Sequence, residues 1–115
     1  MKILSIKEPF ATLIKDDVKI YETRSWKTNY RGEIYIHASK AMSKSENVEK
    51  AMPYLKSELN PGCILCKCNL VDCIYMTEEF IQKIKNDTNE SNYGHYEVGR
   101  YAWTLELIEV LEEPI

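Results

Sequence analysis

The sequence lacks the features of a membrane-spanning or a disordered chain. Its longest apolar runs, such as Ala11 to Ile14, are far shorter than the roughly 20 residues that cross a bilayer as a helix. It has no long tract of Gly, Ser or Pro, and 44% of its residues are hydrophobic, as in an ordinary globular protein. Because a chain of 115 residues normally builds one hydrophobic core, we predict a single domain over residues 1–115.

The sequence also lacks the features of an exported protein. Met1 to Ser5 leads directly into a strand-like pattern, without the continuous apolar stretch and small-residue cleavage site of a signal peptide. All four cysteines fall between Cys63 and Cys73, whereas disulfides of small secreted domains join distant segments. These absences predict reduced thiols and a cytoplasmic location away from membranes.

An excess of positive charge is also absent. The formal net charge of −3 argues against a generic coat protein for nucleic acids. The charge is unevenly distributed, since residues 1–44 carry nine Lys or Arg and five Asp or Glu, whereas residues 45–115 carry six and thirteen. This split fits either one positive face or charges that mix on the surface once the two halves fold together.

Histidine and metal-binding spacings are sparse. The two histidines, His37 and His95, belong to no Ser–His–Asp order. The run from Cys63 to Cys68 is typical of one strand, in which Cys63 and Cys66 point in opposite directions about 10 Å apart. Tetrahedral zinc needs sulfur atoms that converge. We therefore predict buried thiols, with neither a metal site nor another cofactor.

Hydrophobic periodicity predicts five strands and three helices. The predicted strands are Ile3–Lys7, Lys19–Trp26, Glu33–Ser39, Cys63–Tyr75 and Arg100–Leu111. A first helix should begin at Pro9, and a second should run from Ser43 or Ser45 toward Leu59 with a kink at Pro53. Thr77 is expected to cap a third, short helix, and a polar loop should cover 86–94.

This order of elements predicts the fold class. Most neighbouring strands are joined by loops too short for a parallel crossover. We therefore predict an α+β domain with a mixed or antiparallel sheet that closes partly into a small β-barrel, with helices at its ends.

The densest polar segment is Glu22–Gly32, which holds three cations, two aromatic residues and several hydroxyls. Arginine offers a planar fork for phosphate oxygens or a base edge, and Trp26 and Tyr30 offer faces on which a base stacks. Cations interleaved with aromatic rings are typical of binding to single-stranded RNA or nucleotides. The alternative is a polar strand edge followed by a solvated loop.

Strand parity places Glu22 and Arg24 on one face and Thr23 and Ser25 on the other. A Glu–Arg pair that lies in a barrel mouth stabilises the fold little, because desolvation offsets the attraction. Such a pair in a concave site is therefore a candidate for ligand recognition. If the pair is exposed instead, it has no such significance.

Four segments carry a pattern that covers essentially the whole chain: Leu4–Ala11, Lys19–Trp26, Tyr30–Ser39, and Gly99–Trp103 followed by Glu113–Ile115. In this order they resemble the ASCH domain family, which is named for its homology to a transcription coactivator and belongs to the PUA-like superfamily. The family's motif reads Gly-x-Lys-x-x-Glu-x-Arg. It matches at Lys19, Glu22 and Arg24, while Asp17 stands in place of the glycine. Aspartate tolerates left-handed turns, so we expect the turn to survive.

The resemblance implies a small β-barrel with a cleft beside Lys19, Glu22 and Arg24, and a role in RNA binding linked to translation, RNA processing or coactivation. One branch of the family resembles amidohydrolases that remove an acetyl group from acetylated cytidine with a lysine, a threonine and a glutamate. Lys19 stands at that lysine position. However, Glu22 occupies the threonine position, and no motif here supplies the distant glutamate.

Lys19 and Glu22 are the catalytic candidates if the protein is an enzyme. On an ideal strand they face apart, so Lys19 must lie in the preceding turn for the two to converge. A desolvated lysine can act as a base; otherwise Lys19 binds a phosphate or pairs with Glu22. The predicted ligand-binding residues are Lys7, Arg24, Ser25, Trp26, Tyr30, Arg31, His37 and Ser39.

Three functions follow from these features. The leading hypothesis is a module that binds RNA or a nucleotide. The second is an amidohydrolase of a modified nucleoside, and the third is a regulatory domain that binds a protein partner. The third hypothesis rests on the acidic second half of the chain, which includes Glu106, Glu109, Glu112 and Glu113.

Overall fold

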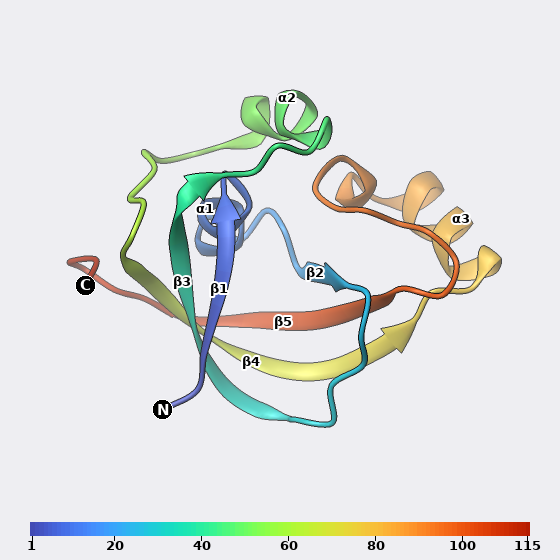
Figure 1. The fold of residues 1–115 in the computed structure, drawn as a ribbon, viewed down its shortest axis with the longest axis horizontal. Coiled ribbons are helices and arrows are strands. Elements are labelled where there is room, and N and C mark those ends of the chain that lie inside the picture. The colour runs from blue at the N-terminus through green and yellow to red at the C-terminus, as the bar shows by residue number, and fades with distance from the viewer.

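The fold is built on one strongly curved sheet of five strands, accompanied by three α-helices (Figure 1). The computed structural model describes residues 1–115. The strands are β1 (Ile3–Glu8), β2 (Tyr21–Arg24), β3 (Gly32–Met42), β4 (Ile64–Tyr75) and β5 (Tyr101–Val110). The helices are α1 (Phe10–Lys15), α2 (Asn47–Ala51) and α3 (Glu78–Asp87), and two short 3-10 turns are η1 (Met52–Tyr54) and η2 (Glu90–Asn92). None of the helices has the length and apolar character needed to cross a bilayer.

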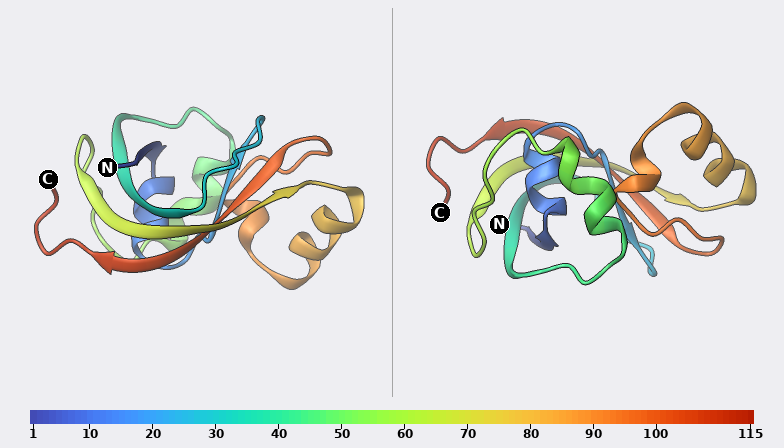
Figure 2. Two further views of the ribbon diagram at one scale, coloured as in Figure 1. Left: turned by 90° about the horizontal axis from the view of Figure 1, so that it is seen from below. Right: turned by 90° about the horizontal axis from the view of Figure 1, so that it is seen from above.

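The strand order in the sheet is β1-β3-β4-β5-β2. β1 pairs with β3 in parallel, and every other pair is antiparallel. The register between β4 and β5 shifts at two points, and such irregularities increase the bend of a sheet. The sheet therefore curls into a half-barrel with α1 inside the curl (Figure 2). The predicted α+β class and partly closed mixed barrel are confirmed.

The core fills the concave side of this half-barrel. Alternate residues of β3 are fully or almost fully buried, namely Ile34, Ile36 and Ala38, as the period of two predicts. Ala11 and Ile14 of α1 pack against the same cluster. α1 therefore contributes to the core, and its first residue, Phe10, packs against the same cluster.

The cysteines lie in this core or pack against it. Cys66 and Cys68 of β4 are completely buried, and both pack in the main cluster. A hydrogen bond with Cys68 and burial raise the pKa of the Cys66 thiol well above its usual value, so this thiol stays protonated. Both residues act as small apolar side chains, in agreement with the prediction.

The second helix is shorter than its sequence pattern predicts. α2 ends at Ala51, a single 3-10 turn follows, and Leu55 is already extended, so the expected continuation to Leu59 is wrong. Pro53 lies in that turn, and proline supplies no N–H to continue an α-helix. The third helix begins as predicted, with the Thr77 hydroxyl accepting a hydrogen bond from the Phe80 amide.

Two further boundaries differ from the prediction. The strand expected over Lys19–Trp26 is limited to the four residues of β2. The loop expected over 86–94 contains the end of α3 and the turn η2. β2 is limited to the residues that pair with the distant strand β5, whereas the end of α3 and the turn η2 are held by local hydrogen bonds at Thr88, Asn92 and Tyr93.

A left-handed residue ends α1 and turns the chain toward β2. Asp17 has φ = 60°, its amide donates to Ile14 O, and the next amide, of Val18, donates to Leu13 O. These two bonds define a Schellman motif, whose left-handed position favours glycine. Aspartate adopts the conformation here, as predicted for the residue that replaces the motif glycine.

We expect Asp17→Gly to raise the free energy of unfolding by about 0.5–1 kcal/mol, because glycine relieves the strain of a left-handed residue. Chemical denaturation measures the change. Asp16→Gly is the matched control. Asp16 has φ = −75° and accepts a hydrogen bond from the Lys56 amide, so glycine there should lower stability. A loss of stability in Asp17→Gly would contradict the argument.

Candidate ligand-binding site

Lys19 occupies the turn between α1 and β2 and points into the protein. Its side chain is 1% exposed. The ammonium group donates hydrogen bonds to Tyr21 O and to Tyr93 O, the latter at 2.8 Å, and it forms an ion pair with Glu22 Oε1 at 3.7 Å. Two hydrogen bonds and one counter-charge thus hold the ammonium group in place. The predicted condition for Lys19 and Glu22 to converge, a lysine in the preceding turn, is met.

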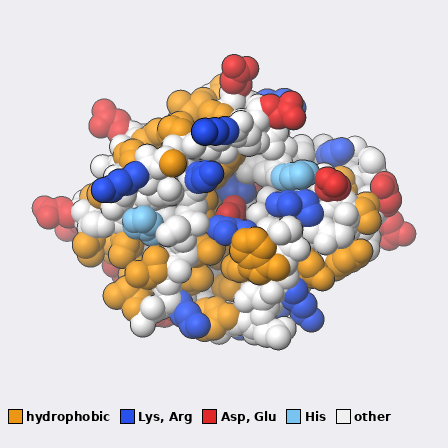
Figure 3. Space-filling model, viewed as in Figure 1, with side chains coloured by type: hydrophobic (Ala, Val, Ile, Leu, Met, Phe, Trp, Pro, Cys, Tyr) orange, Lys and Arg blue, Asp and Glu red, His pale blue; other side chains and the backbone are white.

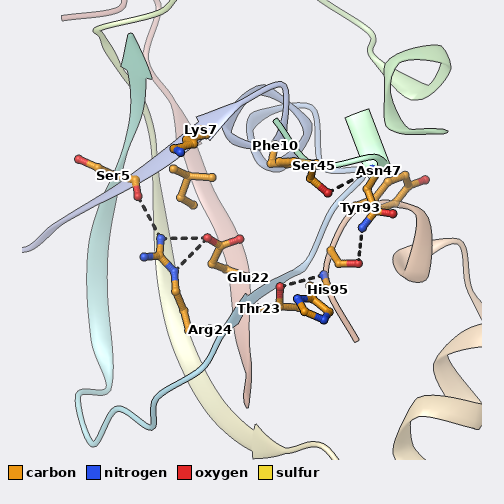
Figure 4. A pocket seen from close by; sticks show the side chains of 12 residues that line it. Ser5, Lys7, Phe10, Glu22, Thr23, Arg24, Ser45, Asn47, Tyr93 and His95 are labelled. Carbon is orange, nitrogen blue, oxygen red and sulfur yellow. Dashed lines mark hydrogen bonds and ion pairs between the residues drawn. The ribbon is translucent and has the colours of Figure 1, made fainter. Parts of the chain in front are cut away.

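Glu22 lies between two cations. One carboxylate oxygen faces Lys19, and the other accepts from Arg24 Nε at 3.1 Å and Nη2 at 2.9 Å. Arg24 Nη2 also donates to Ser5 O of β1 at 3.0 Å. The Arg24 guanidinium therefore links β2 to β1, the two edge strands of the half-barrel, as Figure 4 shows. The chain Lys19–Glu22–Arg24 runs from the interior to the surface.

A second buried carboxylate supports β2 from behind. Glu90 of η2 is 4% exposed and accepts hydrogen bonds from the Ile20 and Tyr21 amides, each at 2.9 Å. Burial raises the pKa of Glu90, although the Lys19 charge and these hydrogen bonds oppose the rise. Sequence reasoning missed Glu90, because it lies in a stretch interpreted as a polar loop and no local pattern marks it.

A pocket of about 330 Å³ opens above Glu22 and Arg24. Figure 3 shows the hollow near the middle of the face, with basic side chains gathered around it. Its walls come from β1, β2, α1, the start of α2 and the loop after η2 (Figure 4). The lining residues are Ser5, Ile6, Lys7, Phe10, Glu22, Thr23, Arg24, Ser45, Asn47, Tyr93, Gly94 and His95.

Three predicted site residues line this pocket, namely Lys7, Glu22 and Arg24. Lys19 lies beneath it, outside the lining. Lys7 is exposed and forms no ion pair within the chain, whereas the carboxylate of Glu22 is engaged by both neighbouring cations. The free positive charge in the pocket therefore comes from Lys7 and from the outer face of Arg24.

The other predicted ligand residues lie outside the pocket, because β2 ends at Arg24 and the chain then turns away. Trp26 is 54% exposed and lies beside Arg24, with its ring centre 5.4 Å from the guanidinium carbon. Ser25 is exposed at the end of β2. The Arg31 guanidinium donates to Thr28 O and Tyr30 O.

The remaining three side chains are engaged elsewhere. Tyr30 packs against the core, and its hydroxyl donates to Glu33 O. The His37 ring is hydrogen-bonded to the Ser5 hydroxyl at 3.0 Å. Ser39 accepts from the amide of Ala41, two residues further along β3.

The pocket also contains residues that the sequence argument missed. Thr23 lines it together with Glu22 and Arg24, although ideal strand parity assigns Thr23 to the opposite face. The Thr23 hydroxyl accepts from the His95 amide at 3.2 Å, and Asn47 Nδ2 donates to Gly94 O at 2.7 Å. The loop 93–95 thus closes the side of the pocket from a distance of about 70 residues in sequence. Gly94 was the one local signal of a close approach.

The similarity of the chain to known proteins shows its family. A sequence model of the ASCH domain matches residues 4–114. The chain belongs to the ASCH domain family. Activating signal cointegrator 1 of Homo sapiens and of Mus musculus are relatives, each 29% identical over 99 residues. These alignments cover 77% of this chain but 17% of each relative. The chain therefore corresponds to a small part of those proteins.

Within this ASCH domain, the three motif residues have different structural roles. Lys19 and Glu22 fix the loop after η2 and the strand β2, and Arg24 joins the two edge strands at the pocket rim. The curved mixed sheet with its helices is the PUA-like arrangement that the resemblance implies. What the pocket can bind depends on the side chains around these three, chiefly Lys7, Asn47 and Phe10.

We expect Gly94→Ala to destabilise the ASCH domain by about 1–3 kcal/mol. A Cβ at Gly94 would lie 2.9 Å from Thr23 Cγ2 and 3.3 Å from Tyr96 Cε1, so the pocket loop must move away from β2. Glycine to alanine usually stabilises a compatible site. The double variant Gly94→Ala/Thr23→Ser removes the methyl group and should recover part of the loss in urea denaturation. Full stability of the single variant would contradict the contact.

Glu90 should make stability depend on pH. The raised pKa of Glu90 means that the carboxyl group stays protonated to a higher pH in the folded state than in the unfolded state. The protonated group therefore contributes to stability below the ordinary pKa of 4.5. This contribution is lost as the pH rises through the pKa of the folded state. The free energy of unfolding of the wild type minus that of Glu90→Gln should therefore fall from acidic to neutral pH. A difference that stays constant or rises over this range would sink the idea.

Proposed function

We propose that this ASCH domain binds single-stranded RNA or a nucleotide in the pocket beside Lys19, Glu22 and Arg24. The observation that carries the proposal is the combination of a preformed hollow of about 330 Å³ with two cations at its rim, Lys7 and Arg24. Pockets of about 300–1,000 Å³ are typical of small-molecule sites. The single carboxylate in the lining, Glu22, is neutralised by its ion pairs, so the pocket favours an anionic ligand.

The remaining lining supplies contacts for the neutral parts of a nucleotide. Phe10 brings an aromatic ring into the wall, and aromatic rings stack on bases of any sequence. The Ser45 hydroxyl and the side-chain oxygen of Asn47 add polar groups that suit sugar hydroxyls and base edges. Arg24 offers a planar fork for a phosphate or a base. Since Glu22 holds this guanidinium in place, it needs little ordering when the ligand arrives.

The contacts of Lys19 favour binding over hydrolysis. A general base needs a free lone pair within reach of the substrate, but the Lys19 ammonium group is engaged in three directions and lies outside the pocket lining. Thr23 does line the pocket, and its hydroxyl accepts a hydrogen bond from the His95 amide. Release of cytidine from acetylated cytidine is the measurement for amidohydrolase activity, and we expect none above the uncatalysed rate.

The proposal also covers the extent of the domain, its location in the cell and further contacts with RNA. We propose that residues 1–115 act as one ASCH-like unit, and that the predicted cytoplasmic location holds, with the four cysteines as free thiols. Trp26, Ser25, Tyr30, Arg31, His37 and Ser39 are kept as contacts for an RNA that extends beyond the pocket. Trp26 is the strongest of them, because its exposed indole lies beside Arg24.

We expect Lys7→Gln to weaken binding of short single-stranded RNA and to reduce the slope of log K against log salt by about 0.7, the value for one phosphate contact. Stability should not change, because Lys7 has no partner within the chain. Lys50→Gln is the control, since Lys50 is exposed on α2 and lies outside the pocket. Fluorescence anisotropy with labelled RNA at low salt measures both.

Arg24→Gln should weaken binding further, because Arg24 contributes both a charge and the link to β1. Arg31→Gln tests whether the ligand reaches past the pocket. The proposal fails if the folded wild-type protein binds neither mononucleotides nor single-stranded RNA at low salt. It also fails if Lys7→Gln and Lys50→Gln bind RNA equally well.

A further inference from the structure

A second recess lies directly beside the first. Its volume is about 290 Å³, and it is bounded by the start of α2, by α3 and by the loop after η2. Four residues, Ser45, Asn47, Gly94 and His95, line both recesses. The two hollows are therefore neighbours in one groove.

One hydrogen bond separates the two recesses. Asn47 Nδ2 donates to Gly94 O at 2.7 Å, and both residues border each recess. Figure 4 shows Asn47 reaching across to this loop at the edge of the first pocket. Asn47 and Gly94 are two of the four residues that the recesses share, so this bond lies on the border between them.

The second recess shares two features with the first, a lysine without an ion pair and an aromatic residue. It has an unpaired lysine, Lys85 of α3, where the first has Lys7, and an aromatic ring, Tyr96, where the first has Phe10. Neither lysine forms an ion pair within the chain. The one carboxylate in the second recess is Glu46, which is exposed and also forms no ion pair. A carboxylate accepts hydrogen bonds from sugar hydroxyls, which a bare phosphate ion lacks.

We propose that the two recesses are adjacent subsites for consecutive nucleotides of single-stranded RNA, with Lys85 contacting the phosphate of the nucleotide in the second recess. This inference rests on the proposed function and narrows it. The ligand class is then an oligoribonucleotide of two residues or more, rather than a free nucleoside or mononucleotide. Each subsite combines an aromatic ring with a cation, which is the pairing that single-stranded nucleic acids require.

The length of the ligand provides the test. Binding is measured with ribonucleoside monophosphates, with dinucleotides and with tetranucleotides of mixed sequence, at several salt concentrations. We expect dinucleotides to bind at least tenfold more tightly than monophosphates. Lys85→Gln should abolish most of this gain and lower the salt slope for dinucleotides by about 0.7, while the affinity for monophosphates stays unchanged.

Lys83→Gln is the matched control, because Lys83 is exposed on the same helix and lines neither recess. It should behave as the wild type. Equal affinities for monophosphates and dinucleotides would overturn the two-subsite inference while leaving the proposed function in place. Equal effects of Lys85→Gln and Lys83→Gln would overturn it too. Failure of every ligand to bind would remove the proposed function and this inference together.

Discussion

The buried ammonium group of Lys19 is the interaction on which the rest of this structure depends. It ties the first residue of β2, through Tyr21 O, to the distant loop after η2, through Tyr93 O. Burying a charge is costly unless it is paired and hydrogen-bonded, and here Glu22 supplies the counter-charge. Removing one partner of such a buried pair typically costs about 3–5 kcal/mol. The loop that forms one wall of the pocket is thus held to β2 by a buried charge with two hydrogen bonds and a counter-charge.

The unclosed barrel explains why the site lies where it does. β1 and β2 are the two free edges of the sheet, and edge strands expose unpaired backbone groups. Arg24 crosses between them and stacks beside two indoles, with centres 5.4 and 5.8 Å from its guanidinium carbon. A fully closed barrel would fill this space with backbone hydrogen bonds. The half-barrel leaves it as a hollow whose rim carries charge.

The sequence was sufficient for much of the fold, because alternation directly reports burial in β3, although adjacent residues are both buried at Leu65–Cys66 in β4 and Ala102–Trp103 in β5. It also identified Lys7, Glu22 and Arg24, which line the pocket, since they fall in a dense polar segment or beside it. It could not place Glu90, Asn47 and Gly94, whose roles arise from contacts between segments about 45–75 residues apart. Strand parity could not indicate that the loop 93–95, which is bonded to Thr23, completes the pocket. The predicted helix α2 was too long, because the helical spacing of apolar residues continues past Pro53.

The Arg24 link between β2 and β1 affects which residues of such a domain can change during evolution. Arg24 grips β1 through a main-chain carbonyl, that of Ser5, and any amino acid provides that oxygen. The Ser5 hydroxyl points away from Arg24 and is bonded to His37 of β3. Evolution can therefore exchange the side chain at position 5 while the mechanical join between the strands stays intact.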